Sequence, residues 1–158
     1  MPIVHARVDE RLIHGQVAMV WTNIVGATCI AVVNDEATKN DMIISALKIA
    51  KPAGVKLSIL SKKRAVEKFE ANEFDKDKVF IITKTIEDMA DIIKAGIPTN
   101  SFNVGNVSKR EATTQIKKSV YLTDNEIIII KDLLKKGIKI TAQMVPNESD
   151  QSIINLLP

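Results

Sequence analysis

The chain has 158 residues, of which 46% are hydrophobic and 26% charged, and its formal net charge is +3. This length suits one domain, and the composition excludes an intrinsically disordered chain, because disorder goes with few hydrophobic residues and a large net charge. The charge is too small, and the 4% of aromatic residues too few, for a nucleic-acid-binding surface.

Short β-branched runs alternate with segments of helical period, a pattern typical of repeated βα units around a mostly parallel sheet. In chain order, the first four predicted strands cover residues 3–8, 28–33, 55–60 and 79–83. The predicted helices between them cover residues 16–25, 41–51 and about 61–72. The next helix carries an apolar stripe and ends before Gly96; the stripe consists of Ile86, Met89, Ala90 and Ile93.

The last third of the chain predicts shorter strands. Residues 102–104 form a fifth strand and 120–122 a candidate sixth, whereas the polar stretch 107–117 predicts no clear element. Thr123 and Glu126 have the spacing of a capping box, and Gly137 ends the helix that follows. A last strand over 138–143 precedes a loop and a short terminal helix over 146–157. We therefore expect a single-domain α/β fold: an open, mostly parallel twisted sheet of about six or seven strands with helices on both faces.

Targeting and redox features favour the cytoplasm. No apolar run approaches the roughly 18 residues of a membrane-spanning helix, and the N-terminus lacks the pattern of a secretory signal. The one cysteine, Cys29, lies in an apolar run and suits a reducing compartment. A role at a membrane would therefore require docking onto a membrane partner.

The loop between the first strand and the first helix concentrates the residues that can do chemistry. It lies at the carboxyl end of a strand, where open α/β folds bind their ligands. His14 directly precedes the helical stripe, so Gly15, Gln16 and Val17 should form the first helical turn, whose amides lack partners within the helix. These amides and the helix dipole favour an anion, and Gly15 allows the backbone to approach it closely. The pattern predicts a phosphate carried by an exposed His14.

Charged residues just before His14 suit the same anion. Arg7 and Arg11 offer guanidinium groups that match phosphate geometry. Asp9 can accept a hydrogen bond from one ring nitrogen of His14, which would leave the other nitrogen free to attack phosphorus. In a plainer interpretation, His14 is a polar cap residue and the arginines form surface ion pairs with Asp9 and Glu10.

Other chemistries have little support in the sequence. A Walker loop, a dinucleotide fingerprint and a nucleophile elbow are all absent. Two histidines and one cysteine without metal-ligand spacing do not predict a metal site. We expect no metal and no cofactor, and a structural role for His5 inside the first strand.

The run RVDERLIHGQV over residues 7–17, with Trp21 after it, resembles the phosphorylation loop of IIB components in the mannose/fructose/sorbose class of the bacterial phosphoenolpyruvate-dependent sugar phosphotransferase system (PTS). Further similarities follow through nearly the whole chain. They are Asn34-Asp35-Glu36, Pro52 with Gly54, Asn103-Val104-Gly105, and Gly137 with Gln143, Val145 and Pro146.

The resemblance implies one PTS EIIB type-4 (mannose-family) domain over residues 1–158, with the activity of a protein-N(pi)-phosphohistidine–sugar phosphotransferase. His14 would accept a phosphoryl group from a IIA component and pass it to a sugar imported through the IIC and IID membrane components. The protein would then be cytoplasmic and peripherally bound to the inner face of the membrane. By position, the resemblance places four residues around the phosphate and Asp35 at the neighbouring strand end; the four are Arg7, Asp9, Arg11 and Gln16.

The resemblance leaves the sugar open among N-acetylgalactosamine, galactosamine, mannose, fructose and sorbose. Asn106 directly after Gly105, together with Gln115-Ile116, is similar to the N-acetylgalactosamine or galactosamine branch. Two other classes of function stay open. One is a non-catalytic phosphate-binding or receiver-like signalling module in which Asp35 takes the phosphate, and the other is a structural subunit of a membrane complex.

Overall fold

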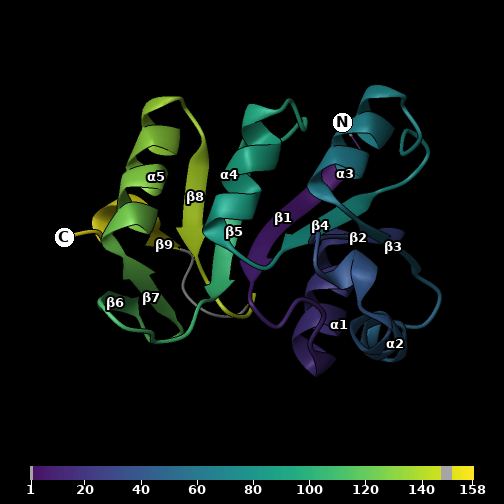
Figure 1. Ribbon diagram of the computed structural model, residues 1–158, viewed down its shortest axis with the longest axis horizontal. Coiled ribbons are helices and arrows are strands. Elements are labelled where there is room, and N and C mark those ends of the chain that lie inside the picture. Colours follow the sequence, from purple (N-terminus) through teal and green to yellow (C-terminus); the bar gives the residue numbers. More distant parts are fainter. Residues whose placement is uncertain (1, 147–150) are drawn as a thin grey trace.

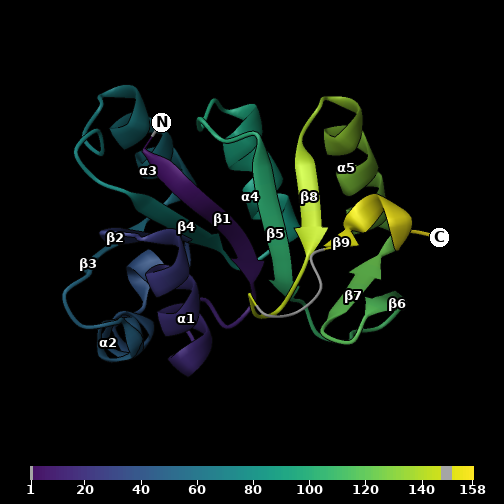
Figure 2. The same cartoon turned by 180° about the vertical axis from the view of Figure 1, so that it is seen from behind.

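A computed structural model describes residues 2–146 and 151–158, and its main feature is an open sheet with helices on both faces (Figures 1 and 2). The strand order is β3-β2-β4-β1-β5-β8-β9, and neighbours pair in parallel except that β9 runs antiparallel to β8. The strands are β1 (Ile3–Asp9), β2 (Cys29–Val33), β3 (Lys56–Leu60), β4 (Val79–Thr83), β5 (Ser101–Asn106), β8 (Lys139–Ala142) and β9 (Gln151–Ser152). The predicted α/β class and sheet are confirmed.

Alternation along the strands divides the core between the two faces of the sheet. Ile30 and Val32 of β2 pack with Trp21 and Leu47, under α1 (Gly15–Val25) and α2 (Asp41–Ala50). Ala31, between them, points to the opposite face, which the remaining helices cover. These are α3 (Lys62–Glu70), α4 (Ile86–Lys94) and α5 (Asp124–Lys135).

The capping box that the sequence predicts is present at the start of α5. The Thr123 hydroxyl accepts a hydrogen bond from Glu126 N at 3.1 Å, and Glu126 Oε1 accepts one from Thr123 N at 2.8 Å. The helix ends at Lys135, two residues before Gly137. Local capping signals therefore placed this helix closely.

Two segments differ from the prediction. β6 (Thr113–Lys117) lies in the stretch for which the sequence predicts no element, and it pairs antiparallel with β7 (Val120–Thr123) in a separate small sheet. The side chains of β6 are exposed or half-buried, so hydrophobic alternation gives no signal for it. Near the C-terminus, β9 is followed by the short 3-10 helix η2 (Ile153–Asn155); a second such helix, η1 (Ala37–Lys39), precedes α2. Among residues 2–146 and 151–158, no helix is long and apolar enough to cross a membrane.

The chain leaves β1 and β5 toward opposite faces of the sheet, although these two strands are neighbours. β1 leads into α1, whereas β5 leads into the β6–β7 pair and α5 (Figures 1 and 2). Open α/β folds bind ligands at such a reversal, at the carboxyl ends of the strands. The fold therefore places the His14 loop at the position most favourable for a site.

Candidate functional site

His14 lies at the amino end of α1 and is exposed to solvent. Its backbone is extended, with φ −135° and ψ 104°, and its side chain forms no capping hydrogen bond. The first backbone bond of the helix is donated by Ala18 N to His14 O at 3.3 Å. The three residues between them are Gly15, Gln16 and Val17. Their N–H groups therefore come before the first backbone hydrogen bond of the helix and suit an anion.

Buried apolar side chains anchor the loop directly before His14. Leu12 and Ile13 are 8% and 5% exposed and pack in the same cluster as Trp21. Leu12 adopts a left-handed backbone conformation with φ 61°, and its N–H donates to Asp9 O at 2.9 Å. Such a conformation costs roughly 1–3 kcal/mol and persists only when its surroundings impose it. The loop is therefore held rigidly, with the imidazole outside.

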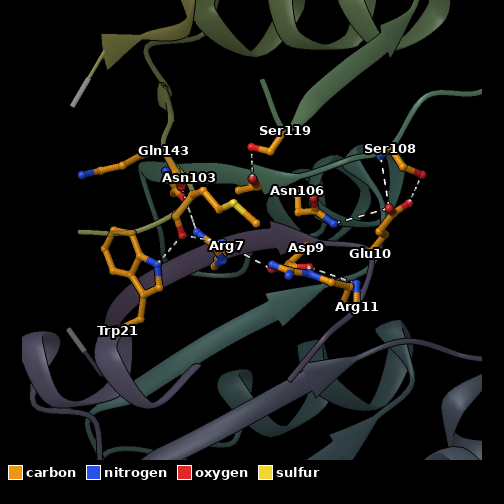
Figure 3. A network of polar contacts seen from close by, with 12 residues as sticks. Arg7, Asp9, Glu10, Arg11, Trp21, Asn103, Asn106, Ser108, Ser119 and Gln143 are labelled. Atoms are coloured by element: carbon orange, nitrogen blue, oxygen red, sulfur yellow. Dashed lines mark hydrogen bonds and ion pairs between the residues drawn. The ribbon is translucent and has the colours of Figure 1, made fainter. Parts of the chain in front are cut away.

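Asp9 is buried at 1% exposure between two guanidinium groups (Figure 3). Its Oδ1 accepts hydrogen bonds from Arg11 N and Arg11 Nε, both at 3.0 Å. Its Oδ2 accepts from Arg11 Nη2 at 2.9 Å and from Arg7 Nη2 at 3.2 Å. The hydrogen bond predicted between Asp9 and His14 is not formed within the described chain, because two cations satisfy the buried carboxylate while the imidazole lies outside.

Arg7 is only 2% exposed, and its guanidinium donates to oxygens of three different segments. Nη1 donates to Asn103 Oδ1 at 2.6 Å and to Gln143 O at 2.9 Å. Nη2 donates to Met144 O at 2.9 Å as well as to Asp9. This burial does not fit the direct phosphate-binding role predicted for Arg7. Successive side chains of a strand point to opposite faces of the sheet. Ala6 and Val8 pack into the core on one face, so Arg7 points to the other face.

Arg11 lies in the loop itself, and its side chain is 24% exposed. Asp9 engages the Nε and Nη2 edge of the guanidinium, whereas Nη1 has no partner within the part of the chain that the structure describes. One carboxylate between two arginines leaves one positive charge in excess. The site therefore combines an exposed imidazole, free helical amides and an oriented cation, an arrangement suited to an anionic group on the ring.

Glu10 joins the loop to the end of β5 and the residues directly after it, a role that the sequence did not suggest. Its Oε1 accepts from Ser108 N at 3.2 Å and Asn106 Nδ2 at 3.4 Å, and its Oε2 accepts from Ser108 Oγ at 2.9 Å. Glu10 N also donates to Asn106 O at 3.0 Å. In the sequence, Asn106 was noted only for its similarity to the N-acetylgalactosamine or galactosamine branch.

Asp35 lies farther from the loop than predicted. It follows β2, and β4 separates β2 from β1, so Asp35 is not at the neighbouring strand end. Its exposed carboxylate accepts a hydrogen bond from Lys62 N, at the first residue of α3, at 2.8 Å. The predicted position was wrong because local sequence patterns do not show that β4 lies between β2 and β1 in the sheet.

His5 is half-buried and lies against α1. Its ring stacks on Trp21, with centroids 4.5 Å apart and planes 13° apart, and it also contacts Phe80. Burial, with a smaller contribution from the positive charge of Arg7, lowers the pKa of His5 to about 4. His5 is therefore neutral at pH 7 and supports the packing of α1 on β1.

Comparisons with known proteins agree on one family. Residues 3–158 match the family model described as the PTS system sorbose subfamily IIB component. The sorbose-specific EIIB component of Lacticaseibacillus casei is 32% identical, covering 98% of this chain and 94% of its own. The N-acetylgalactosamine-specific IIB component 2 of Escherichia coli is 30% identical, with 98% of both chains covered. The crystal structure of the IIBSor domain of the sorbose permease from Klebsiella pneumoniae superposes with a TM-score of 0.93 at 28% identity, covering 98% of this chain and 95% of that one.

Proposed function

The chain belongs to the IIB components of the sorbose subfamily of the PTS, a family of phosphotransferases, and we propose that it carries a phosphoryl group on His14. The observation that carries this proposal is the exposed imidazole at the amino end of α1, beside amides outside the helical ladder. A phosphoryl carrier needs such exposure because two partners must reach the ring in turn. The unit that does this is one EIIB domain over residues 1–158.

The proposed reaction has two transfers. In the first, a ring nitrogen of His14 forms a bond to phosphorus as the corresponding bond in the donor phosphohistidine breaks. In the second, a sugar hydroxyl oxygen bonds to phosphorus, the His14–phosphorus bond breaks, and the hydroxyl proton is lost. Phosphoryl transfer has a loose, in-line transition state, so positioning and charge stabilisation supply most of the catalysis.

Each residue of the site has a distinct proposed role. The backbone amides of Gly15, Gln16 and Val17 and the guanidinium of Arg11 hold the phosphoryl oxygens. Asp9 orients Arg11 through hydrogen bonds to Nε and Nη2. Charge-assisted pairs of this kind fix a guanidinium in one orientation, which lowers the cost of organising it around the phosphate.

The proposed partners follow from membership of the family. A IIA component donates the phosphoryl group, and the IIC and IID membrane components present the sugar, so the protein works at the cytoplasmic face of the membrane. We propose a sugar of the sorbose, N-acetylgalactosamine, galactosamine, mannose or fructose type, since relatives are named for sorbose and N-acetylgalactosamine. The activity is that of a protein-N(pi)-phosphohistidine–sugar phosphotransferase.

The experiment is a transfer assay with the general PTS proteins, a cognate IIA and labelled phosphoenolpyruvate. Wild-type protein should take up label that acid releases and base does not, and His14→Ala should take up none while keeping its circular dichroism spectrum. His14→Ala that still accepts label would overturn the proposal. Label released by hydroxylamine would instead indicate an acyl phosphate and support the receiver-like alternative.

A further inference from the structure

Arg7 stands at the centre of a buried polar cluster that joins three segments of the chain (Figure 3). It comes from β1, and its Nη1 donates to the Asn103 side chain of β5 and to Gln143 O after β8. Its Nη2 donates to Met144 O and to Asp9. A buried guanidinium with this many acceptors is stabilised only while all of these groups stay in register.

The same cluster reaches α1 through Trp21. Trp21 Nε1 donates to Met144 O at 3.0 Å, so this one carbonyl accepts from both the indole and Arg7. The Arg7 Cζ atom also lies 5.4 Å from the centroid of the Trp21 ring, within range of a cation–π contact. The segment after β8 is thereby tied to β1 and to the helix that begins after His14.

Gly105 of β5 makes room for this guanidinium. A Cβ atom built on Gly105 would lie 2.0 Å from Arg7 Cζ, far inside van der Waals contact. The backbone of Gly105 does not have the positive φ that favours glycine, so the close approach of Arg7 is what excludes a side chain. Even an alanine here would displace the Arg7 guanidinium.

The cluster connects to the reaction through one carboxylate. Asp9 Oδ2 accepts from Arg7 Nη2 and Arg11 Nη2 together, so the position of one arginine affects the other. We propose that Arg7 is a positioning residue: without touching the phosphate, it holds Asp9, and through Asp9 the partly exposed Arg11 guanidinium, on the loop that carries His14. This inference rests on the proposed function of His14.

A lysine cannot replace Arg7 in this cluster. The guanidinium is a planar fork that serves acceptors on β1, on β5 and after β8 at once, whereas an ammonium group is a compact point charge. Arg7→Lys therefore keeps the charge but loses the geometry. We expect it to leave Asp9 less firmly held and Arg11 misoriented.

The test is a double-mutant cycle on single-turnover phosphorylation of His14 by phosphorylated IIA. Arg7→Lys and Arg11→Gln should each lower the rate constant, by roughly ten- to hundredfold for Arg7→Lys, a loss on the scale of misplaced catalytic groups. The double variant should be no slower than Arg11→Gln alone, because Arg7 acts through Arg11. Multiplied losses would contradict the inference and indicate that Arg7 acts on the phosphate independently.

Gly105→Ala is the second variant, because it displaces the guanidinium and leaves every charge in place. It should lower the rate constant as Arg7→Lys does and should also add nothing to Arg11→Gln. Arg64→Lys, at an exposed position of α3, is the matched control and should transfer at the wild-type rate. Normal rates in both Arg7→Lys and Gly105→Ala would overturn the inference.

Two readouts separate this inference from general unfolding and from the proposed function. Partial unfolding lowers the amplitude of the single turnover, whereas mispositioning lowers its rate constant at full amplitude. A change of amplitude alone would contradict a positioning role. Failure of the wild-type protein to label at His14 would overturn the proposed function itself, whereas a labelled wild type with unaffected Arg7 variants would overturn only this inference.

Discussion

The imidazole of His5 lies flat on the indole of Trp21, with ring centroids 4.5 Å apart. The stack joins β1 to α1 at Trp21, in the helix that begins directly after His14. The imidazole in this stack is neutral. The pKa of His5 is lowered to about 4 mainly by burial, from 6.5 for a histidine in water. The two histidines of the chain therefore occupy different environments, one half-buried and one exposed.

This pKa predicts a dependence of stability on pH. The unfolded state binds a proton at His5 below pH 6.5 and the folded state only near pH 4, so the contribution is complete above pH 6.5 and is lost as the pH falls toward 4. His5→Phe keeps an aromatic ring but cannot take up the proton. Urea unfolding between pH 7 and 4 should show the wild type losing up to about 3 kcal/mol more than the variant. Parallel loss in both proteins would contradict this account of His5.

Gly15 and Gly26, at the two ends of α1, provide a matched pair of substitutions. Both have positive φ, 44° and 68°, and a Cβ atom would meet no atom within 4 Å at either position. Alanine at either site should therefore cost about 1–2 kcal/mol of conformational strain without a steric clash. Only Gly15→Ala alters the amides proposed to hold the phosphate.

We expect Gly15→Ala to slow phosphorylation of His14 clearly, and Gly26→Ala to leave its rate constant unchanged at similar loss of stability. Thermal unfolding and single-turnover transfer on both variants provide the comparison. Equal rates in the two variants would argue against a role for the backbone at the start of α1.

Asp35 is expected to support α3 and not the phosphoryl group. Asp35→Ala removes the acceptor of the Lys62 N–H and should cost about 1 kcal/mol of stability, whereas Asp35→Asn keeps an acceptor and should cost less. Both variants should accept label at the wild-type rate. Loss of labelling in Asp35→Asn with the fold intact would show that Asp35 takes part in phosphorylation and would favour the receiver-like alternative.

The capping box of α5 predicts a local effect on stability. Thr123→Ala removes the hydroxyl that accepts from Glu126 N and should lower the free energy of unfolding by about 1 kcal/mol. Thr123→Ser retains the acceptor and serves as the control. Denaturant titration of the three proteins measures the difference; an alanine variant as stable as the serine variant would show that the cap contributes little.

The sequence was sufficient for the features that local patterns encode. Apolar runs such as Val79–Thr83 predicted the strands of the sheet. The apolar stripe ending at Val25 predicted a helix that begins directly after His14. The environment of Arg7 was not predictable, because its guanidinium donates to Gln143 O in the segment after β8. Gln143 is 136 residues away in the sequence. The partly exposed strand β6 was missed for a related reason, since its pairing leaves no hydrophobic pattern.

Phosphorylation of His14 can be tested by mapping the modified residue with tandem mass spectrometry at alkaline pH, after incubation with phosphorylated IIA. We expect one added phosphate, found on the peptide that contains His14 and located on its imidazole. A phosphate on Asp35, on His5 or on any other residue would contradict it.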